Sequence, residues 1–317
     1  MRTVEDVRTT DARFPGVVAT VGCFDGVHLG HQQILDALLE ESRAIGGTAA
    51  VMTLEPHPRQ YFFPENAPNI LTDARTKRRL LEERGVDVVY TLPFDRDSAA
   101  MSAQQFVESI LVGQCKVEKV VVGHDFAFGH DASGDYEYLT TAARRHGFEV
   151  RQIPPLIIGG QRVSSTLIRE RVIQGEVCNL EQYLGRKFSL TGTVIAGRGI
   201  GRILGFPTAN LDVGTCATPA HGVYAAEAFV RDTRYVAAVN IGIAPTIRDE
   251  HALVEAHLLD YTGDLDVAEI EIAFHKRLRP EKKFASRDAL SEAIAADVQC
   301  IREYFSRMRP QEATRLL

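Results

Sequence analysis

The first half of the chain alternates short apolar runs with stretches whose apolar residues recur every three or four positions. The β-branched apolar runs are residues 17–21, 49–54, 86–92, 119–123 and 150–153. The helices predicted between them are residues 31–45, 73–84 behind a cap at Thr72, 102–111 behind a capping box of Ser102 and Gln105, and 136–146. This alternation predicts an α/β, Rossmann-like parallel sheet with helices on both faces, whose ligands bind where the strands end.

The pattern changes after a further helical stretch at residues 166–174. From there the β-runs follow one another, punctuated by Gly and Pro, at residues 190–195, 222–230, 234–241, 255–259 and 269–274. Such a succession predicts a small, closed antiparallel β-barrel. A final helical pattern at 287–305 carries an apolar stripe that should pack on the barrel. The polar stretch 175–187 divides the chain into predicted domains of residues 1–183 and 184–317.

Composition and charge narrow the class of protein. A chain of 317 residues with 45% hydrophobic and 25% charged residues suits two folded domains. The formal net charge of −6 offers no basic field for nucleic acid. We find no signal peptide and no apolar run of the roughly 18 residues that a membrane span needs. The five cysteines form no C-x-x-C pair, so we expect reduced thiols, a cytoplasmic location and no membrane partner. A homo-oligomer is left open.

A glycine-rich segment directly follows the first predicted strand. Residues 22–31, here called the phosphate loop, read Gly-Cys-Phe-Asp-Gly-Val-His-Leu-Gly-His. A strand, a glycine turn and a helix start form an anion site, because free backbone N–H groups and the helix dipole point at the ligand. His28 and His31, three apart, can face one phosphate and stabilise its developing charge, while Gly30 lets the backbone come close. Half of a zinc site, or histidines that merely cap or fill the core, are the alternatives.

A second hydroxyl-rich cluster begins the helical stretch at 166–174. Ser164, Ser165 and Thr166 are followed by Arg169 one turn later. Hydroxyl donors and a guanidinium in this arrangement suit the binding of a triphosphate, although a simple helix N-cap is the alternative.

The His-x-Gly-His string resembles the signature of class I nucleotidylyltransferases, which attack the α-phosphorus of a nucleoside triphosphate. Together with residues 55–58 (Glu-Pro-His-Pro), 123–129 and 164–169, the first half resembles the FMN adenylyltransferase module of the prokaryotic bifunctional riboflavin kinase/FAD synthetase family. The resemblance implies that His28 and His31 are catalytic. It implies ATP-binding roles for Gly22, Phe24, Asp25, Gly30, Ser164, Thr166 and Arg169. It implies flavin-binding roles for His57, Asp125, Phe126 and Phe128.

The chain departs from the usual family pattern at the flavin site. Ala127 stands where the family has arginine, and residues 130–133 replace a basic stretch. These departures concern contacts to the flavin phosphate rather than the chemistry of the two histidines.

The second half opens with another glycine-rich segment, residues 197–207, here called the glycine loop. Pro207 prevents a helix directly after the glycines, which argues against a dinucleotide-binding fingerprint. The loop amides can instead cover phosphates. Thr208 and Asn210, two apart on an extended segment, present neutral oxygens that suit Mg²⁺. The alternative is an ordinary turn whose Thr and Asn bind their own backbone.

Further motifs follow in the order of riboflavin kinases, at residues 205–210, 222–224, 240–246, 254–257 and 278–284. This half therefore resembles the kinase module of the same family. The resemblance implies that Glu255 is the general base and that Thr208 and Asn210 lie at Mg²⁺-ATP. It implies nucleotide binding by Gly197, Gly201, Arg202, Gly205, Pro207, Thr208 and Asn210. Asp266-Val267 replaces a usual Tyr-Gly pair, which could slow the kinase; His257 could tune Glu255 or serve barrel packing.

The resemblance implies a bifunctional transferase that phosphorylates riboflavin to FMN and adenylylates FMN to FAD with release of pyrophosphate. Its substrates would be riboflavin, FMN and ATP, with Mg²⁺ as the metal. Two alternatives are an FMN adenylyltransferase with an inactive kinase barrel, and a non-catalytic flavin-binding regulator.

Overall fold

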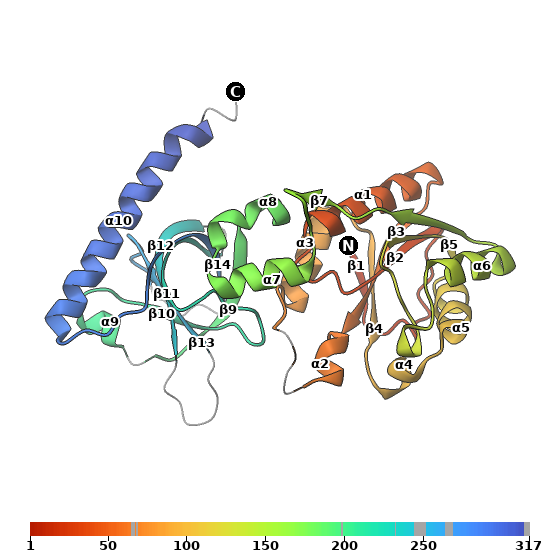
Figure 1. The fold of residues 1–317 in the computed structure, drawn as a ribbon, viewed down its shortest axis with the longest axis horizontal. Helices are drawn as coiled ribbons and strands as arrows, with labels where there is room; N and C mark the ends of the chain where they lie inside the picture. Colours follow the sequence, from red (N-terminus) through yellow and green to blue (C-terminus); the bar gives the residue numbers. More distant parts are fainter. Residues whose placement is uncertain are drawn as a thin grey trace. The chain divides into compact units, whose positions relative to one another are not determined.

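The computed structural model describes residues 1–64, 67, 69–197, 199–231, 233–243, 252–263 and 269–313. The chain forms two compact units, Met1–Ser165 and Thr166–Leu317 (Figure 1). This division precedes the predicted boundary at 183/184. The helical segments between the two positions are α7 (Ser165–Gln174), the 3₁₀ helix η3 (Val177–Asn179) and α8 (Glu181–Leu184). Where one functional domain gives way to the other stays a prediction.

The first unit is built on a six-stranded parallel sheet, which confirms the predicted α/β architecture. The strands are β1 (Arg2–Val4), β2 (Val17–Val21), β3 (Thr48–Glu55), β4 (Val88–Pro93), β5 (Val117–Gly123) and β6 (Glu149–Ile153). Their order in space is β1-β4-β3-β2-β5-β6, with every neighbouring pair parallel. The chain runs outward from β2 through β3 to β4 and then returns to β5 on the other side of β2. The switch point of the sheet therefore lies between β2 and β5.

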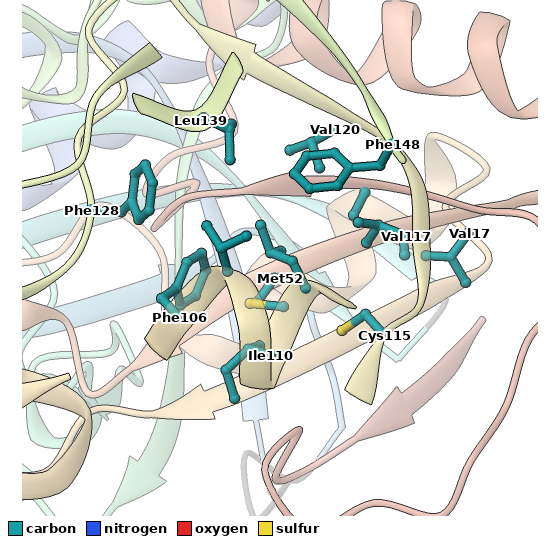
Figure 2. Packing of buried hydrophobic residues seen from close by; sticks show 14 of the residues in the cluster. Val17, Met52, Phe106, Ile110, Cys115, Val117, Val120, Phe128, Leu139 and Phe148 are labelled. Carbon is teal, nitrogen blue, oxygen red and sulfur yellow. The ribbon is translucent and has the colours of Figure 1, made fainter. Parts of the chain in front are cut away.

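Helices cover both faces of this sheet. On one face α1 (Leu29–Ala44) and α3 (Ala74–Glu83) bury Leu35 and Leu81 against strand residues such as Val18. On the other face lie the π-helix η1 (Phe106–Gln114) and α6 (Tyr136–His146). Figure 2 shows this second cluster, which includes Phe106 of η1, Leu139 of α6 and Val17 of β2. Because adjacent strand residues point to opposite faces, Val17 and Val18 belong to different halves of the core.

Shorter elements connect these layers. They are α2 (Pro58–Phe62), α4 (Arg96–Ala100), α5 (Ala103–Gln105), the 3₁₀ turn η2 (His130–Ala132) and the hairpin of β7 (Ile157–Ile158) with β8 (Gln161–Arg162). The capping box of Ser102 and Gln105 is confirmed. Beyond Gln105 the helix widens to i→i+5 hydrogen bonding, with the Cys115 amide donating to the Ile110 carbonyl.

The predicted cap of α3 at Thr72 is wrong by one residue. Asp73 has the extended backbone of an N-cap, and its carboxylate accepts from the Thr76 amide at 2.6 Å. The Thr72 hydroxyl instead accepts from the Gly26 amide of the phosphate loop at 3.0 Å. The Thr72 side chain, which the sequence predicted to cap α3, is therefore used in a tertiary hydrogen bond to the phosphate loop.

The second unit is a closed antiparallel barrel, as the sequence predicts. Its strands are β9 (Phe188–Ile195), β10 (Ala209–Asp212), β11 (Gly222–Val230), β12 (Thr233–Ile243), β13 (Ala252–Leu258) and β14 (Glu269–Pro280). The closed order is β10-β13-β12-β11-β14-β9. The terminal helix α10 (Arg287–Ala313) packs Ile301 and Phe305 against Ala225 of the barrel. Arg279 of β14 adds an ion pair with Asp297 of α10 at 2.7 Å.

Candidate functional site

The phosphate loop leaves β2 with an unusual backbone and is tied to the residues that precede α3. Phe24 and Val27 have φ values of 48° and 39°. The Asp25 carboxylate accepts from the amides of Leu71 and Thr72 at 2.7 and 3.1 Å. Asp25 is only 4% exposed. The residue predicted to bind ATP therefore has a carboxylate that is buried and shapes the loop.

His28 begins α1 and orients its neighbour. Its Nδ1 accepts a hydrogen bond from the His31 amide at 3.2 Å, so in the neutral ring the proton lies on Nε2. The two imidazoles are stacked, with ring centroids 3.6 Å apart and planes 16° apart. A Cβ at Gly30 would lie 3.2 Å from the His28 ring and 3.5 Å from the Val163 carbonyl, which explains why the string needs glycine there.

His31 is held in its neutral form. Burial, together with the positive charge that His28 and Lys77 can carry, lowers the pKa of His31 well below 6.5. Its Nδ1 is buried and, among the described residues, finds no hydrogen-bond partner. A neutral imidazole with an unused polar atom suits hydrogen bonding to a ligand. The predicted pair thus lies together at the helix start.

A cavity of about 700 Å³ opens where β2 and β5 end, at the switch point of the sheet, and is of the size of a small-molecule site. His31, Gly22 and Phe24 line it from the phosphate loop. Most of its remaining walls are apolar, and include Val21, Ile34, Leu54, Leu92, Phe94, Phe106 and Phe128. Phe126 and Phe128 are stacked, with centroids 5.2 Å apart. The structure therefore brings His31 of the phosphate loop together with Phe126 and Phe128, two of the residues predicted to bind flavin.

Asp125 also lines this cavity, and its side chain is ionised. Burial alone would raise its pKa, but a hydrogen bond and the charges of Arg162 and His124 outweigh burial and lower it. Arg162 lies on β8 and pairs with Asp125 Oδ2. The sequence reasoning missed Arg162, whose only local signal is its place just before the hydroxyl-rich cluster.

His57, the remaining residue predicted to bind flavin, does not line the cavity. His57 caps α2: its Nδ1 accepts from the Arg59 amide at 3.1 Å, and Pro58 rather than His57 lines the cavity. Ala127, Asp131 and Ala132 do line it. None of the described lining residues is Lys or Arg, in keeping with the departures noted in the sequence.

The hydroxyl-rich cluster spans the division between the units. Ser164 and Ser165 belong to the first unit, where the Ser165 hydroxyl donates to the Asp25 carbonyl at 2.8 Å. Thr166 and Arg169 lie on α7 in the second unit, and Arg169 is 8% exposed. Their predicted contact with ATP stays a prediction.

In the barrel, Glu255 of β13 lies between two asparagines of neighbouring strands. It stands opposite Asn210 of β10 and opposite Asn240 of β12. The Asn240 amide donates to Glu255 Oε2 at 3.2 Å. Residues directly opposite in a ladder point to the same face, so the predicted general base and the predicted metal ligand Asn210 are neighbours.

The glycine loop lies against the other predicted ligands. A Cβ at Gly197 would stand 1.8 Å from Asn210 Nδ2, and one at Gly201 would stand 3.0 Å from Thr208 Oγ1. The described part of the loop includes the short helix α9 (Ile200–Ile203), on which Arg202 is exposed. After Pro207 the chain enters β10, so no helix follows the proline, as expected.

Two further features of the glycine loop complete the site. Gly205 has φ 85°, a conformation that favours glycine. His257, on the same strand as Glu255, hydrogen-bonds through Nδ1 to the Pro207 carbonyl at 2.8 Å. His257 therefore supports the glycine loop.

Comparisons with known proteins agree with this arrangement. A family model described as FAD synthetase matches residues 11–167, and one described as riboflavin kinase matches residues 184–305. The bifunctional riboflavin kinase/FMN adenylyltransferase of Escherichia coli strain K12 is 39% identical over 296 residues, which cover 93% of this chain and 95% of that protein. The enzyme of the same description from Pseudomonas fluorescens is 39% identical over 303 residues, 95% and 97% of the two chains. The chain belongs to the bifunctional riboflavin kinase/FMN adenylyltransferase family.

A solved structure shares the fold of this family member. It is described as a macrolide-efflux protein from Streptococcus pneumoniae, is 27% identical, and has a TM-score of 0.84 over 95% of this chain and 98% of its own. Among the described helices of the present chain, none combines the length and apolar composition that a membrane span requires.

The donor set of the barrel fits Mg²⁺. Thr208 and Asn210 offer neutral oxygens, and Glu255 stands opposite Asn210 in the ladder. Oxygen-only ligands are what Mg²⁺ prefers, and nucleotide phosphates and water commonly complete its octahedron. The altered turn at Asp266-Val267 lies outside the described residues.

Proposed function

We propose that this chain makes FAD in two ATP-dependent steps, phosphorylating riboflavin in the barrel and adenylylating the resulting FMN in the first unit. One observation carries the proposal: each unit keeps a glycine-rich loop beside the polar side chains that its reaction needs. In the first unit these are His31, which lines an aromatic cavity, and His28, which is stacked on it. In the second they are Glu255 and Asn210 on paired strands.

In adenylyl transfer, a phosphate oxygen of FMN attacks the α-phosphorus of ATP and pyrophosphate leaves. The isoalloxazine ring suits the cavity lined by Phe126 and Phe128. His28 and His31 donate hydrogen bonds to charge that develops on the α-phosphate, a stabilisation that imidazoles already in place supply without reorganisation. Ser164, Thr166 and Arg169 are proposed to hold the rest of the triphosphate.

In the kinase step, Glu255 accepts the proton of the ribityl 5′-hydroxyl as that oxygen attacks the γ-phosphorus of ATP. The Asn240 amide holds the carboxylate in place at 3.2 Å. The glycine loop with Arg202 covers the nucleotide. Mg²⁺, held by Thr208 and Asn210, would neutralise phosphate charge. We place both activities in the cytoplasm and expect no partner among nucleic acids or membranes.

The deciding experiment follows flavins by chromatography after riboflavin, ATP and Mg²⁺ are added to the purified chain. FMN should rise and then give way to FAD. Glu255→Gln should lower FMN formation about 10²–10⁴-fold while FAD still forms from supplied FMN. His31→Gln should leave FMN to accumulate.

Other outcomes would favour the alternatives. FAD formed by the native chain only from supplied FMN would mean an adenylyltransferase with an inactive barrel. Quenching of flavin fluorescence with no conversion and no ATP consumption would contradict the enzyme reading and support a flavin-binding regulator.

A further inference from the structure

A lysine lies buried beneath the phosphate loop. Lys77 of α3 is 7% exposed, an unusual place for an ammonium group, which is costly to bury unless it is hydrogen-bonded and paired. Its Nζ donates to the Thr53 hydroxyl of β3 at 2.9 Å and forms an ion pair with Glu55 Oε1 at 3.1 Å. It also lies 3.4 Å from the Cys23 carbonyl oxygen of the phosphate loop.

The carboxylate that pairs with Lys77, Glu55, has a second cationic partner, Arg78. Glu55 Oε2 also accepts from Arg78 Nη2 at 3.3 Å. Arg78 has a second partner, Glu5, whose side chain is 71% exposed and well solvated. The Glu55 carboxylate, which is only partly buried, thus stands between two cations, and positive charge remains behind the loop. The charge of buried Lys77 acts more strongly than a charge at the surface, because water screens it less.

The phosphate loop is therefore supported at two points by one part of the chain. Lys77 engages the carbonyl of Cys23 from the first turns of α3. Leu71 and Thr72, just before α3, hold Asp25 and Gly26. With the Cys23 carbonyl turned toward the lysine, the loop is fixed from beneath while its other face borders the cavity.

We propose that Lys77 is a positioning residue for adenylyl transfer, which fixes the phosphate loop through the Cys23 carbonyl and places buried positive charge behind the nucleotide phosphates. This inference rests on the proposed FMN adenylyltransferase activity of the first unit. The native chain is therefore assayed first: if it does not adenylylate FMN, the proposed function fails and not this inference alone.

The first test compares Lys77→Met with Arg79→Met, a matched change on an exposed position of the same helix. Lys77→Met should lower kcat/KM for ATP in FMN adenylylation about tenfold to hundredfold, as expected for loss of a charged hydrogen-bonding group. Arg79→Met and the riboflavin kinase reaction of both variants should stay within about twofold. Unchanged adenylylation kinetics in Lys77→Met would overturn the proposal.

The second test separates charge from structural support and uses the acid limb of the pH–rate profile. The charges that act on His31 are those of His28 and Lys77, and the titratable groups that line the cavity with it are Cys23, Asp125 and Asp131. Without the lysine charge, the pKa of His31 should rise and the acid limb should move to higher pH. Lys77→Arg, which keeps the charge, should leave the limb in place. A limb that moves equally in both variants would contradict the electrostatic role.

Glu55→Gln should move the acid limb in the direction opposite to Lys77→Met. This test remains usable even if Lys77→Met does not fold. It removes the carboxylate but keeps the lysine, so more positive charge acts on His31. The acid limb should then move to lower pH, and the KM for ATP should not rise. A limb that stays in place or moves upward in folded Glu55→Gln would overturn the inference.

Discussion

At the scale of single residues, the two histidines of one motif are held in different ways. His28 is an N-cap whose Nδ1 accepts a backbone hydrogen bond. His31 borders the cavity, and its Nδ1 has no partner among the described residues. The Cys23 thiol beside them stays protonated, because burial raises its pKa to about 11 although the Lys77 charge opposes this. Because no thiolate forms at Cys23, the imidazoles of His28 and His31 are the groups of the phosphate loop that we expect to act on a ligand.

The depressed pKa of His31 predicts how stability depends on pH. The folded chain resists protonation of His31, whereas the unfolded chain takes up that proton below its ordinary pKa of 6.5. The free energy of unfolding should therefore be intact above this pH and fall below it, by at most about 1.4 kcal/mol per pH unit for one group. His31→Gln should remove this part of the acid sensitivity.

Urea unfolding at neutral pH and about two units lower measures the effect, with His130→Gln as the control because His130 is exposed. An identical loss of stability in the native chain and in His31→Gln would contradict the assignment.

At the scale of elements, both loops owe their shape to glycines that admit a neighbouring side chain. Gly26 turns at φ 82° with Leu71 close by, and Gly30 packs against the His28 ring. In the barrel, Gly197 makes room for Asn210. Each glycine stands where a Cβ would displace a polar side chain or its support, so substitution should act on function through geometry.

Gly197→Ala tests this argument. Its Cβ would lie 1.8 Å from Nδ2 and 2.7 Å from Cγ of Asn210, so the asparagine must move. We expect kcat/KM for ATP in riboflavin phosphorylation to fall about tenfold or more. Adenylylation of supplied FMN by the same variant serves as the control and should not change. Native kinase kinetics in Gly197→Ala would show that the kinase reaction does not require Asn210 to stay in its present position beside residue 197.

At the scale of the whole molecule, the cavity beside His31 and the cluster around Glu255 each lie inside one unit with its own core. The cavity and the histidines draw on the parallel sheet, and Glu255 with its asparagines draws on barrel strands alone. A defect in one site should therefore leave the other intact.

Mixing two single-site variants tests this independence. His31→Gln should make FMN but little FAD, and Glu255→Gln should make FAD only from supplied FMN. Together they should convert riboflavin to FAD after a lag, because FMN made by one chain can diffuse to another. Chromatography over time measures the products. A mixture that accumulates FMN without FAD would contradict passage through solution.

The sequence by itself determined those features that depend on neighbours along the chain. Tyr136–His146 and Gly222–Val230 begin and end where periodicity places them. The spacing of apolar residues within each segment is enough to identify an amphipathic helix or a strand. The phosphate loop could also be recognised, since its strand, turn and helix start are contiguous and the spacing of His28 and His31 is set by the helix.

Only the tertiary structure decided the contacts between distant segments. It showed that the Asp25 carboxylate is buried and holds residues 71 and 72, and it moved the cap of α3 to Asp73. It paired Arg162 with Asp125 and placed Lys77 beneath Cys23. Burial and the charges around a side chain come from residues far away in sequence, and local spacing carries no trace of them.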